Sequence, residues 1–368
     1  LRHEQPEWVP IPTHVDPYNQ PRKDGMDPAL AEKLGTVRWG DDSMIHMDAY
    51  FKTDTCEWAG APIASQRTKV AVEWKKDGED QIQIWHTPLG DLRQVTRPCA
   101  GGSYTVEHLL KTPDDIPAFA FAFEDETYSI DAPAVERRAH KRTLIGDNGL
   151  INFAGPSTPL GMLVRVYAGP ETTAYLCADA PDEIRQLFSI MEENYRRYYT
   201  LAATLDSDML TCVDDTSTTT ISPSMFEEHC LEYTTRMADL VHAAGKFYIH
   251  HSCGLIRDLL PLYRQTRMDA VHAFTIPPLG NATVADGRRG LGDRIAIWTW
   301  CAQVSWSTFS NRAATYESIR QMYHEAEHNR NLIFGIGADP VNTMADLEWV
   351  YATARACEKE ILGTTRRA

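Results

Sequence analysis

Short apolar runs alternate with amphipathic stretches along the second half of the chain, and this alternation restricts the possible folds most strongly. Met209 to Val213 and Phe247 to His250 have the length and apolar character of buried strands. Asp182 to Leu201 instead places apolar residues on one face at a helical spacing. Strands separated by helices at this pitch are typical of a parallel sheet with helical connections.

We expect eight such strands, near residues 9, 151, 172, 210, 248, 271, 297 and 333. Eight parallel strands with helical crossovers predict an α/β fold, a single (β/α)8 barrel of the TIM type. Because no linker or repeat interrupts the pattern, we predict one domain over 1–368.

The barrel is expected to carry an N-terminal β-hairpin and helical elaboration. Apolar and polar residues alternate on both sides of Asp77-Gly78, which predicts a β-hairpin within an insertion at 65–100. It is interpreted as a lid or a dimer contact, and the sequence does not separate the two. Residues 104–141 are predicted to be helical, with Thr112 as a cap before Pro113.

Composition excludes some classes of function. The net charge of -15 would repel a nucleic acid, and no basic stripe offsets it. No apolar run reaches the roughly 18 residues needed to cross a bilayer. The eight cysteines are scattered, which favours reduced thiols and a cytoplasmic protein.

The segment K-F-Y-I-H-H-S-C-G at 246–254 is the strongest candidate for chemistry. His251 and Cys253 follow a predicted strand, so an imidazole and a thiolate can face one ion, a pair suited to zinc. A lone H-x-C motif is weak evidence. Cys253 as a small buried side chain and His251 as a hydrogen-bonded loop residue remain alternatives.

In a barrel, residues just after the strands collect on one rim, where the chemistry of such barrels is found. On this rim we expect donors that zinc accepts, although they are equally consistent with a solvated barrel mouth: His14, Asp214, Asp215, His251, His272, Cys253, Cys301 and Asp339. Trp298, Trp300 and Trp306 would give the site an apolar wall. Tryptophan faces can hold a methylammonium group, but these residues are equally suited to filling the core.

Three motifs resemble the uroporphyrinogen decarboxylase superfamily, which includes zinc-dependent, cobalamin-linked methyltransferases. D-T-S-T-T-T-I-S-P at 215–223 is similar to the decarboxylases' F-D-S-W-x-x-x-L-S-P, and I-N-F-A-G-P-S-T-P-L at 151–160 is similar to their G-F-x-G-x-P-x-T-L. H-S-C-G at 251–254 resembles the H-x-C-G of the methyltransferases. V-P-I-P-T-H stands where the decarboxylases have R-Q-A-G-R, which favours the methyltransferase branch.

The resemblance implies that His251 and Cys253 bind zinc. The family's third ligand is a cysteine in a late G-C-G segment, but this chain has G-I-G-A-D-P with Ile336 at that position. Cys301 is the first candidate for the replacement, and Asp339, His272 and Asp215 are others.

The resemblance also implies a zinc-dependent methyltransferase or demethylase that moves a methyl group between a small methylated substrate and a corrinoid or thiol acceptor. Cobalamin is expected on a partner protein, and a homodimer is one expected assembly. Asp215 and His14 are the candidate catalytic residues. Trp298, Trp300, Asp214 and His272 are the candidate substrate-binding residues.

Two other functions remain open. The chain is also consistent with a metal-independent decarboxylase that uses Asp215 and His14, or with a non-catalytic binding member of the family. The sequence does not identify the methyl donor or the methyl acceptor.

Overall fold

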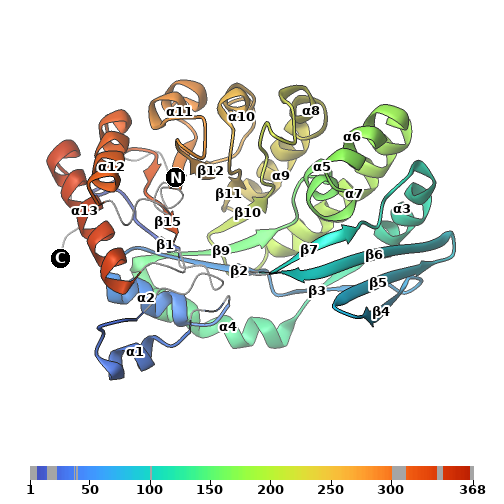
Figure 1. The fold of residues 1–368 in the computed structure, drawn as a ribbon, viewed down its shortest axis with the longest axis horizontal. Helices are drawn as coiled ribbons and strands as arrows, with labels where there is room; N and C mark the ends of the chain where they lie inside the picture. The colour runs from blue at the N-terminus through green and yellow to red at the C-terminus, as the bar shows by residue number, and fades with distance from the viewer. Residues whose placement is uncertain are drawn as a thin grey trace.

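The computed structural model describes residues 6–14, 23–36, 38, 40–99, 102–300, 312–337 and 343–364. Its centre is a curled sheet of seven parallel strands (Figure 1). Their order is β14 (Leu332–Ile333), β13 (Ala296–Trp300), β12 (Ala270–Thr275), β11 (Phe247–His251), β10 (Met209–Val213), β9 (Gly149–Gly155) and β2 (Thr55–Gly60).

The N-terminal segment lies between the two edges of this sheet. β1 (Thr13–His14) pairs in parallel with β15 (Ile336–Gly337), and Pro12 forms a parallel bridge with Asp54. The backbone N–H of Phe334 donates to Pro10 O at 2.9 Å, and that of Asp54 donates to Ile11 O at 3.0 Å. Residues 10–14 therefore contact the β2 edge on one side and the β14 edge on the other.

Two of the eight predicted strands, those near residues 172 and 9, were wrong, and one strand, β2, was missed. The strand expected near 172 is helix α6 (Pro170–Asp179), which begins with proline at its first position. β2 was not predicted, although five of its six residues are buried. The strand expected near residue 9 is instead β1 at 13–14. The main sheet thus has seven strands, and the division into one domain stays a prediction.

Helices cover the outside of the curled sheet (Figure 1). In chain order they are α5 (Pro159–Met162), the π-helix η3 (Leu163–Tyr167), α6, α7 (Pro181–Ala202), α8 (Pro223–His229), α9 (Leu231–Ala243), η4 (Arg257–Leu259), α10 (Leu260–Tyr263), α11 (Val284–Leu291), α12 (Arg312–Ala326) and α13 (Met344–Leu362). Helix α7 confirms its prediction, since Ile184, Leu187 and Met191 are buried along one face. These outer helices share a hydrophobic core with outward-facing strand residues such as Leu210 and Phe274.

A four-stranded antiparallel sheet projects from this core (Figure 1). It consists of β4 (Ala71–Asp77), β5 (Asp80–Thr87), β6 (Gly90–Cys99) and β7 (Gly102–Glu107), in that order. One face packs on α3 (Ile116–Asp125), where Trp85 stacks on Phe119 with ring centroids 5.9 Å apart.

The prediction that residues 104–141 are helical was wrong at two strands, β7 and β8 (Thr127–Ile130). Alternating residues around Tyr104 and Val106 form strand β7. The 3-10 helix η1 (Pro113–Asp115) and α3 follow, and Thr112 forms the capping box of η1. β8 comes next and pairs with β3 (Ile63–Gln66). It is followed in the chain by α4 (Ala132–Ile145) and η2 (Gly146–Asn148). The remaining helices are α1 (Pro28–Leu34) and α2 (Ser43–Phe51).

Within the described ranges, every helix is too short or too polar to cross a lipid bilayer.

Candidate functional site

Three adjacent strands bring polar side chains together at their carboxyl ends. Parallel pairing places Val213 of β10 beside His251 of β11, and His251 beside His272 of β12. Asp215 follows β10 by two residues, and Cys253 follows β11 by two. Parallel strands end at the same edge of a sheet, so this register sets the four side chains at one level.

Asp215, His251 and Cys253 form a cluster of three donors. His251 Nε2 lies 2.8 Å from Asp215 Oδ1, and the Cys253 thiol donates to the same oxygen at 3.4 Å. Their ligand atoms all lie within 4.8 Å of one another, and all three residues are partly exposed. Imidazole, thiolate and carboxylate are the donors that zinc accepts, and three protein ligands with solvent access are typical of a catalytic site. The donor set therefore fits a zinc ion.

Asp215 is held in a strained and ionised state. Its φ of +51° lies in the left-handed region, which is costly for a residue with a side chain. Arg165 Nε contacts Asp215 Oδ2 at 2.9 Å. Burial opposes ionisation, but the hydrogen bond from His251 and the charges of His251 and Arg165 outweigh it and lower the pKa of Asp215. One carboxylate oxygen thus faces Arg165 while the other faces His251 and Cys253.

The Cys253 thiol is protonated in the absence of a cation. Burial, the negative charge of Asp215 and the hydrogen bond to it raise the pKa of Cys253 to about 12. A thiolate forms here only where a positive charge offsets Asp215. The positive charge of Arg165 lowers the pKa of Cys253, but it does not offset burial and the charge of Asp215.

His272 lies beneath the cluster, inside the sheet. Its Nδ1 lies 2.8 Å from His251 Nδ1, and its ring centroid is 4.6 Å from those of both Trp58 and Trp298. The register of β12 shifts between His272 and Phe274, and Ala273 has a φ of +57°. A bulge of this kind re-aims a side chain beside a site, which accounts for the inward direction of His272.

Asp214 contacts the protein rather than solvent. It is fully buried, and Oδ1 accepts hydrogen bonds from the backbone N–H and the hydroxyl of Thr158, both at 2.9 Å. Burial raises the pKa of Asp214 to about 6, against the lowering effect of these bonds. A Cβ on Gly161 would lie 1.8 Å from Asp214 Oδ1, so glycine is required there. The carboxylate thus links β10 to the start of α5, where Thr158 is the N-cap and its side chain accepts from the backbone N–H of Gly161.

A second group of donors, Cys212, Asp214 and His250, is completely buried. Burial lowers the pKa of His250 to about 3, and its Nε2 lies 3.0 Å from the Thr216 hydroxyl. Asp214 is closely packed against Thr158 and Gly161. We therefore assign this group to the hydrogen-bond network of the protein interior.

A match to a protein-family model complements this geometry. The model described as "Uroporphyrinogen decarboxylase (URO-D)" matches residues 110–353, more than half of the chain. The chain belongs to the uroporphyrinogen decarboxylase family.

Two solved structures are similar over nearly the whole chain. A methyltransferase from Methanosarcina mazei has a TM-score of 0.58 at 12% identity, covering 97% of this chain and 95% of that one. A B12-independent methionine synthase from Shewanella has a TM-score of 0.48 at 8% identity, covering 97% and 98%. At its low identity, the first likeness establishes a shared fold. No curated protein sequence matches this chain.

Several predicted site residues of this family member are only partly placed. β1 sets the backbone of His14 opposite Gly337, and its side chain is not described. Ile336 lies in β15, also without a described side chain. Cys301, Trp306 and Asp339 lie outside the described residues. The first candidate for the third ligand therefore stays a prediction, and Asp215, another predicted candidate, is the described residue that lies with His251 and Cys253.

Sequence reasoning missed Arg165 and Trp58. It searched only the residues that follow strands, whereas Arg165 lies in the π-helix η3 and Trp58 lies within β2. Single-turn π-helices are frequent at functional sites, but nothing in L-V-R-V-Y indicates one in advance. Trp58 was missed together with the strand that carries it.

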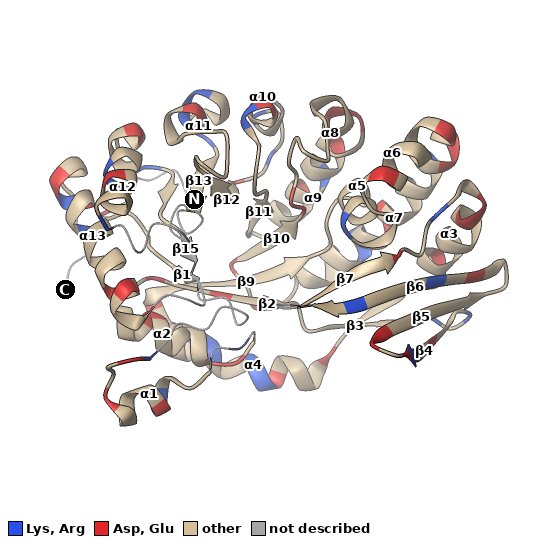
Figure 2. Cartoon of the chain, viewed as in Figure 1, with Lys and Arg blue, Asp and Glu red and all other residues tan. Residues whose placement is uncertain are grey.

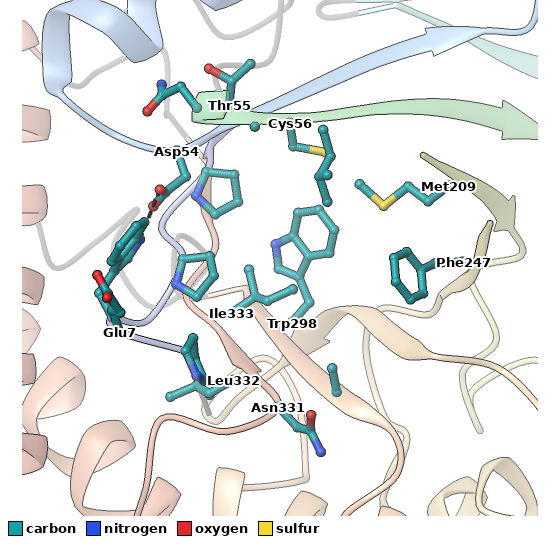
Figure 3. Close-up of a pocket in the computed structure, with 18 of the residues that line it drawn as sticks. Glu7, Asp54, Thr55, Cys56, Met209, Phe247, Trp298, Asn331, Leu332 and Ile333 are labelled. Carbon is teal, nitrogen blue, oxygen red and sulfur yellow. Dashed lines mark hydrogen bonds between the residues drawn. The ribbon is translucent and has the colours of Figure 1, made fainter. Parts of the chain in front are cut away.

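A cavity of about 560 Å³ lies at the opposite end of the strands (Figure 3). Its lining includes the first residues of β2, β10, β11 and β13: Thr55, Met209, Phe247 and Ala296. Trp298 also lines it and packs on His272. The layer that contains Trp298 therefore separates this cavity from the donors at the carboxyl ends.

Proposed function

We propose that this protein is a zinc-dependent methyltransferase or demethylase of the uroporphyrinogen decarboxylase family. It moves a methyl group between a small methylated substrate and a corrinoid or thiol acceptor. The observation that carries the proposal is the convergence of Asp215, His251 and Cys253 on one partly exposed point at the carboxyl end of the sheet.

The residues that would hold the zinc are His251 through Nε2, Cys253 through Sγ and Asp215 through Oδ1. When bound, zinc supplies Lewis acidity, which lowers the pKa of a thiol or polarises the group that leaves the methyl carbon. Three protein donors leave a fourth position for the substrate. Cys301 and Asp339 remain candidates for a further ligand.

The surrounding residues orient these donors. Arg165 holds Asp215 Oδ2, so that Oδ1 turns toward His251 and Cys253. His272 holds the far nitrogen of His251. Asp215 is also the candidate that orients substrate or transfers a proton, together with His14.

The four predicted substrate-binding residues divide into two groups. Trp300 is half-buried, and its ring centroid lies 5.8 Å from that of His272, so it supplies an apolar wall beside the site. Trp298, His272 and Asp214 are 3%, 2% and 0% exposed. They support the site from below, and direct contact of these three residues with substrate stays a prediction.

The acceptor and the partner follow from the resemblance. Cobalamin on a separate corrinoid protein is the proposed acceptor for demethylation, and a free thiol is the proposed acceptor for methylation. We propose that the reaction takes place in the cytoplasm.

A second candidate, metal-independent decarboxylation, is favoured by the family and by Arg165, whose guanidinium could bind a substrate carboxylate. Its contact with Asp215 argues against this, because that pair already neutralises the charge.

The decisive experiment measures metal and activity on the same preparation. The protein is purified without added zinc, its metal content is determined by mass spectrometry, and methyl transfer from methylated thiols and amines is assayed with free cob(I)alamin as the acceptor. We expect about one zinc per chain and loss of both zinc and activity in Cys253→Ala. Cys99→Ala is the matched control, because Cys99 is an exposed thiol far along β6. A folded, metal-free protein that releases carbon dioxide in the presence of a chelator would support decarboxylation instead.

A further inference from the structure

The outermost strand of the projecting sheet carries an exposed apolar stripe. β4 is the first strand in the order β4-β5-β6-β7, and no described strand pairs with its outer side. Trp74 is 62% exposed and Val72 is 41% exposed. An edge strand presents unpaired N–H and C=O groups, so exposed apolar residues on it mark a surface suited to strand addition.

The stripe continues the buried face of the same sheet. Val72 lies opposite Trp85, and Trp74 lies opposite Gln83. Trp85 is covered by Phe119 of α3. The helix covers the middle of this face but leaves Trp74, at the edge, exposed.

The sequence of β4, A-V-E-W-K-K-D, is complementary to itself in one antiparallel register. When two copies pair about a two-fold axis at Trp74, Glu73 of each faces Lys75 of the other. Trp74 faces Trp74, and Val72 faces the aliphatic stem of Lys76. Opposite charges and aromatic pairs directly across two strands are both stabilising. A two-fold pairing of this kind uses the same patch on both copies.

Neighbouring registers that keep the same face together are unfavourable. Centring the axis on Glu73 sets two glutamates opposite each other, and centring it on Lys75 sets two lysines opposite each other and Glu73 opposite Asp77. Like charges directly across two strands are destabilising. Figure 2 shows that β4 carries charges of both signs. The charge pattern therefore favours the register centred on Trp74 over these two neighbours.

We propose that β4 is a homodimer interface, in which β4 of one copy pairs antiparallel with β4 of a second copy at Trp74. The pairing joins the two projecting sheets into one continuous sheet. It also gives the projecting sheet a function that is separate from the donors at the carboxyl ends of the main sheet.

The first test uses charge reversal. In Lys75→Glu, Glu73 of one copy would face a glutamate of the other, so we expect self-association to weaken at least tenfold in sedimentation equilibrium. The double variant Glu73→Lys with Lys75→Glu restores opposite charges across the interface and should restore the dimer. Circular dichroism establishes that each variant is folded. A monomeric wild-type protein at tens of micromolar, or a Lys75→Glu variant that associates as tightly as wild type, overturns the proposal.

The second test reports the register. In a Cys99→Ser background, Trp74→Cys should form a disulfide-linked dimer under mild oxidation, because residue 74 faces itself. Tyr104→Cys, which introduces a cysteine at a 49% exposed position on the opposite edge strand β7, is the matched control and should stay monomeric. Equal cross-linking of the two variants, or cross-linking of Tyr104→Cys alone, contradicts the proposed pairing.

Discussion

The Nδ1 atoms of His251 and His272 lie 2.8 Å apart, so the two rings share one proton at this contact. When His251 is neutral and binds no metal, its Nε2–H donates to Asp215 and its Nδ1 accepts, so His272 Nδ1–H is the donor. A metal on His251 Nε2 would require the reverse, with His251 donating from Nδ1. His272 accepts either role because imidazole exists in two tautomers, and the tryptophan rings around it fix its plane.

We predict that His272 strengthens metal binding without touching the metal. A partner that holds the far nitrogen of a metal-bound histidine is typically worth 10- to 100-fold in metal affinity. His272→Ala should therefore bind zinc about 10- to 100-fold more weakly, measured by competition with a chromophoric chelator. His272→Gln, which retains an acceptor, should recover part of the affinity. His140→Ala is the control, because His140 is an exposed residue of α4 that contacts Asp42 at the start of α2. Unchanged affinity in His272→Ala, with zinc bound in wild type, would show that the contact is only structural.

Asp215→Asn and Cys212→Ala separate the two groups of donors. Asp215→Asn removes an ionised ligand and the negative charge that pairs with Arg165, so we expect loss of zinc from a protein that remains folded. Cys212 belongs to the completely buried group, and Cys212→Ala should keep its zinc while losing about 1 kcal/mol of unfolding free energy. Metal analysis and urea unfolding on both variants check the prediction. Zinc lost from Cys212→Ala and retained in Asp215→Asn would assign the metal to the interior group.

The sequence predicted best where local pattern and burial coincide. The helix at 182–201 and the strands at 210, 248, 271 and 297 show a clear period, and each lies where the pattern predicted. The sequence did not reveal strand β2, because its buried residues include Glu57. The charge of Glu57 is paired with Lys141 of α4 at 2.5 Å. An ion pair across distant segments makes a buried strand look polar in the sequence.

The sequence predicted that the site residues lie at the carboxyl ends of the strands, but it did not predict the contacts between them. His251 and Cys253 were identified by their position after a strand, and the register of parallel strands adds His272. The sequence does not reveal that Asp214 turns into the core while Asp215 turns toward the mouth. That difference depends on the left-handed φ of Asp215, which no local pattern encodes.

We predict that the cavity at the amino ends of the strands takes no part in the reaction. Ala296 lines it, and the layer of Trp58, Trp298 and His272 lies between it and the donors. Ala296→Val adds two methyl groups to the lining of this cavity, so kcat/KM for methyl transfer should remain within about twofold. Trp300→Ala should raise KM, because Trp300 flanks the site. Steady-state kinetics on both variants check this, and an Ala296→Val enzyme with a sharply raised KM would place substrate in the cavity.

Asp48 predicts an unusual dependence of stability on pH. Burial raises the pKa of Asp48 to about 8, although hydrogen bonds from Thr13 and Thr53 oppose the shift. Between the unfolded pKa, near 4, and the folded value, the folded protein holds a proton that the unfolded chain has released. Stability therefore falls as pH rises through this window, by up to about 1.4 kcal/mol per pH unit.

Asp48→Asn should remove this dependence, because its amide keeps an acceptor for Thr13 N–H and cannot ionise. Urea unfolding of both proteins at pH 5 and pH 8 measures the difference. Relative to the variant, the wild-type protein should lose several kcal/mol between the two pH values. Asp48 anchors Thr13, which precedes His14 and pairs with β15, so the same titration should loosen the N-terminal segment. Hydrogen exchange at Thr13 that accelerates with pH more in wild type than in Asp48→Asn supports this, and parallel unfolding free energies for the two proteins across the window would contradict it.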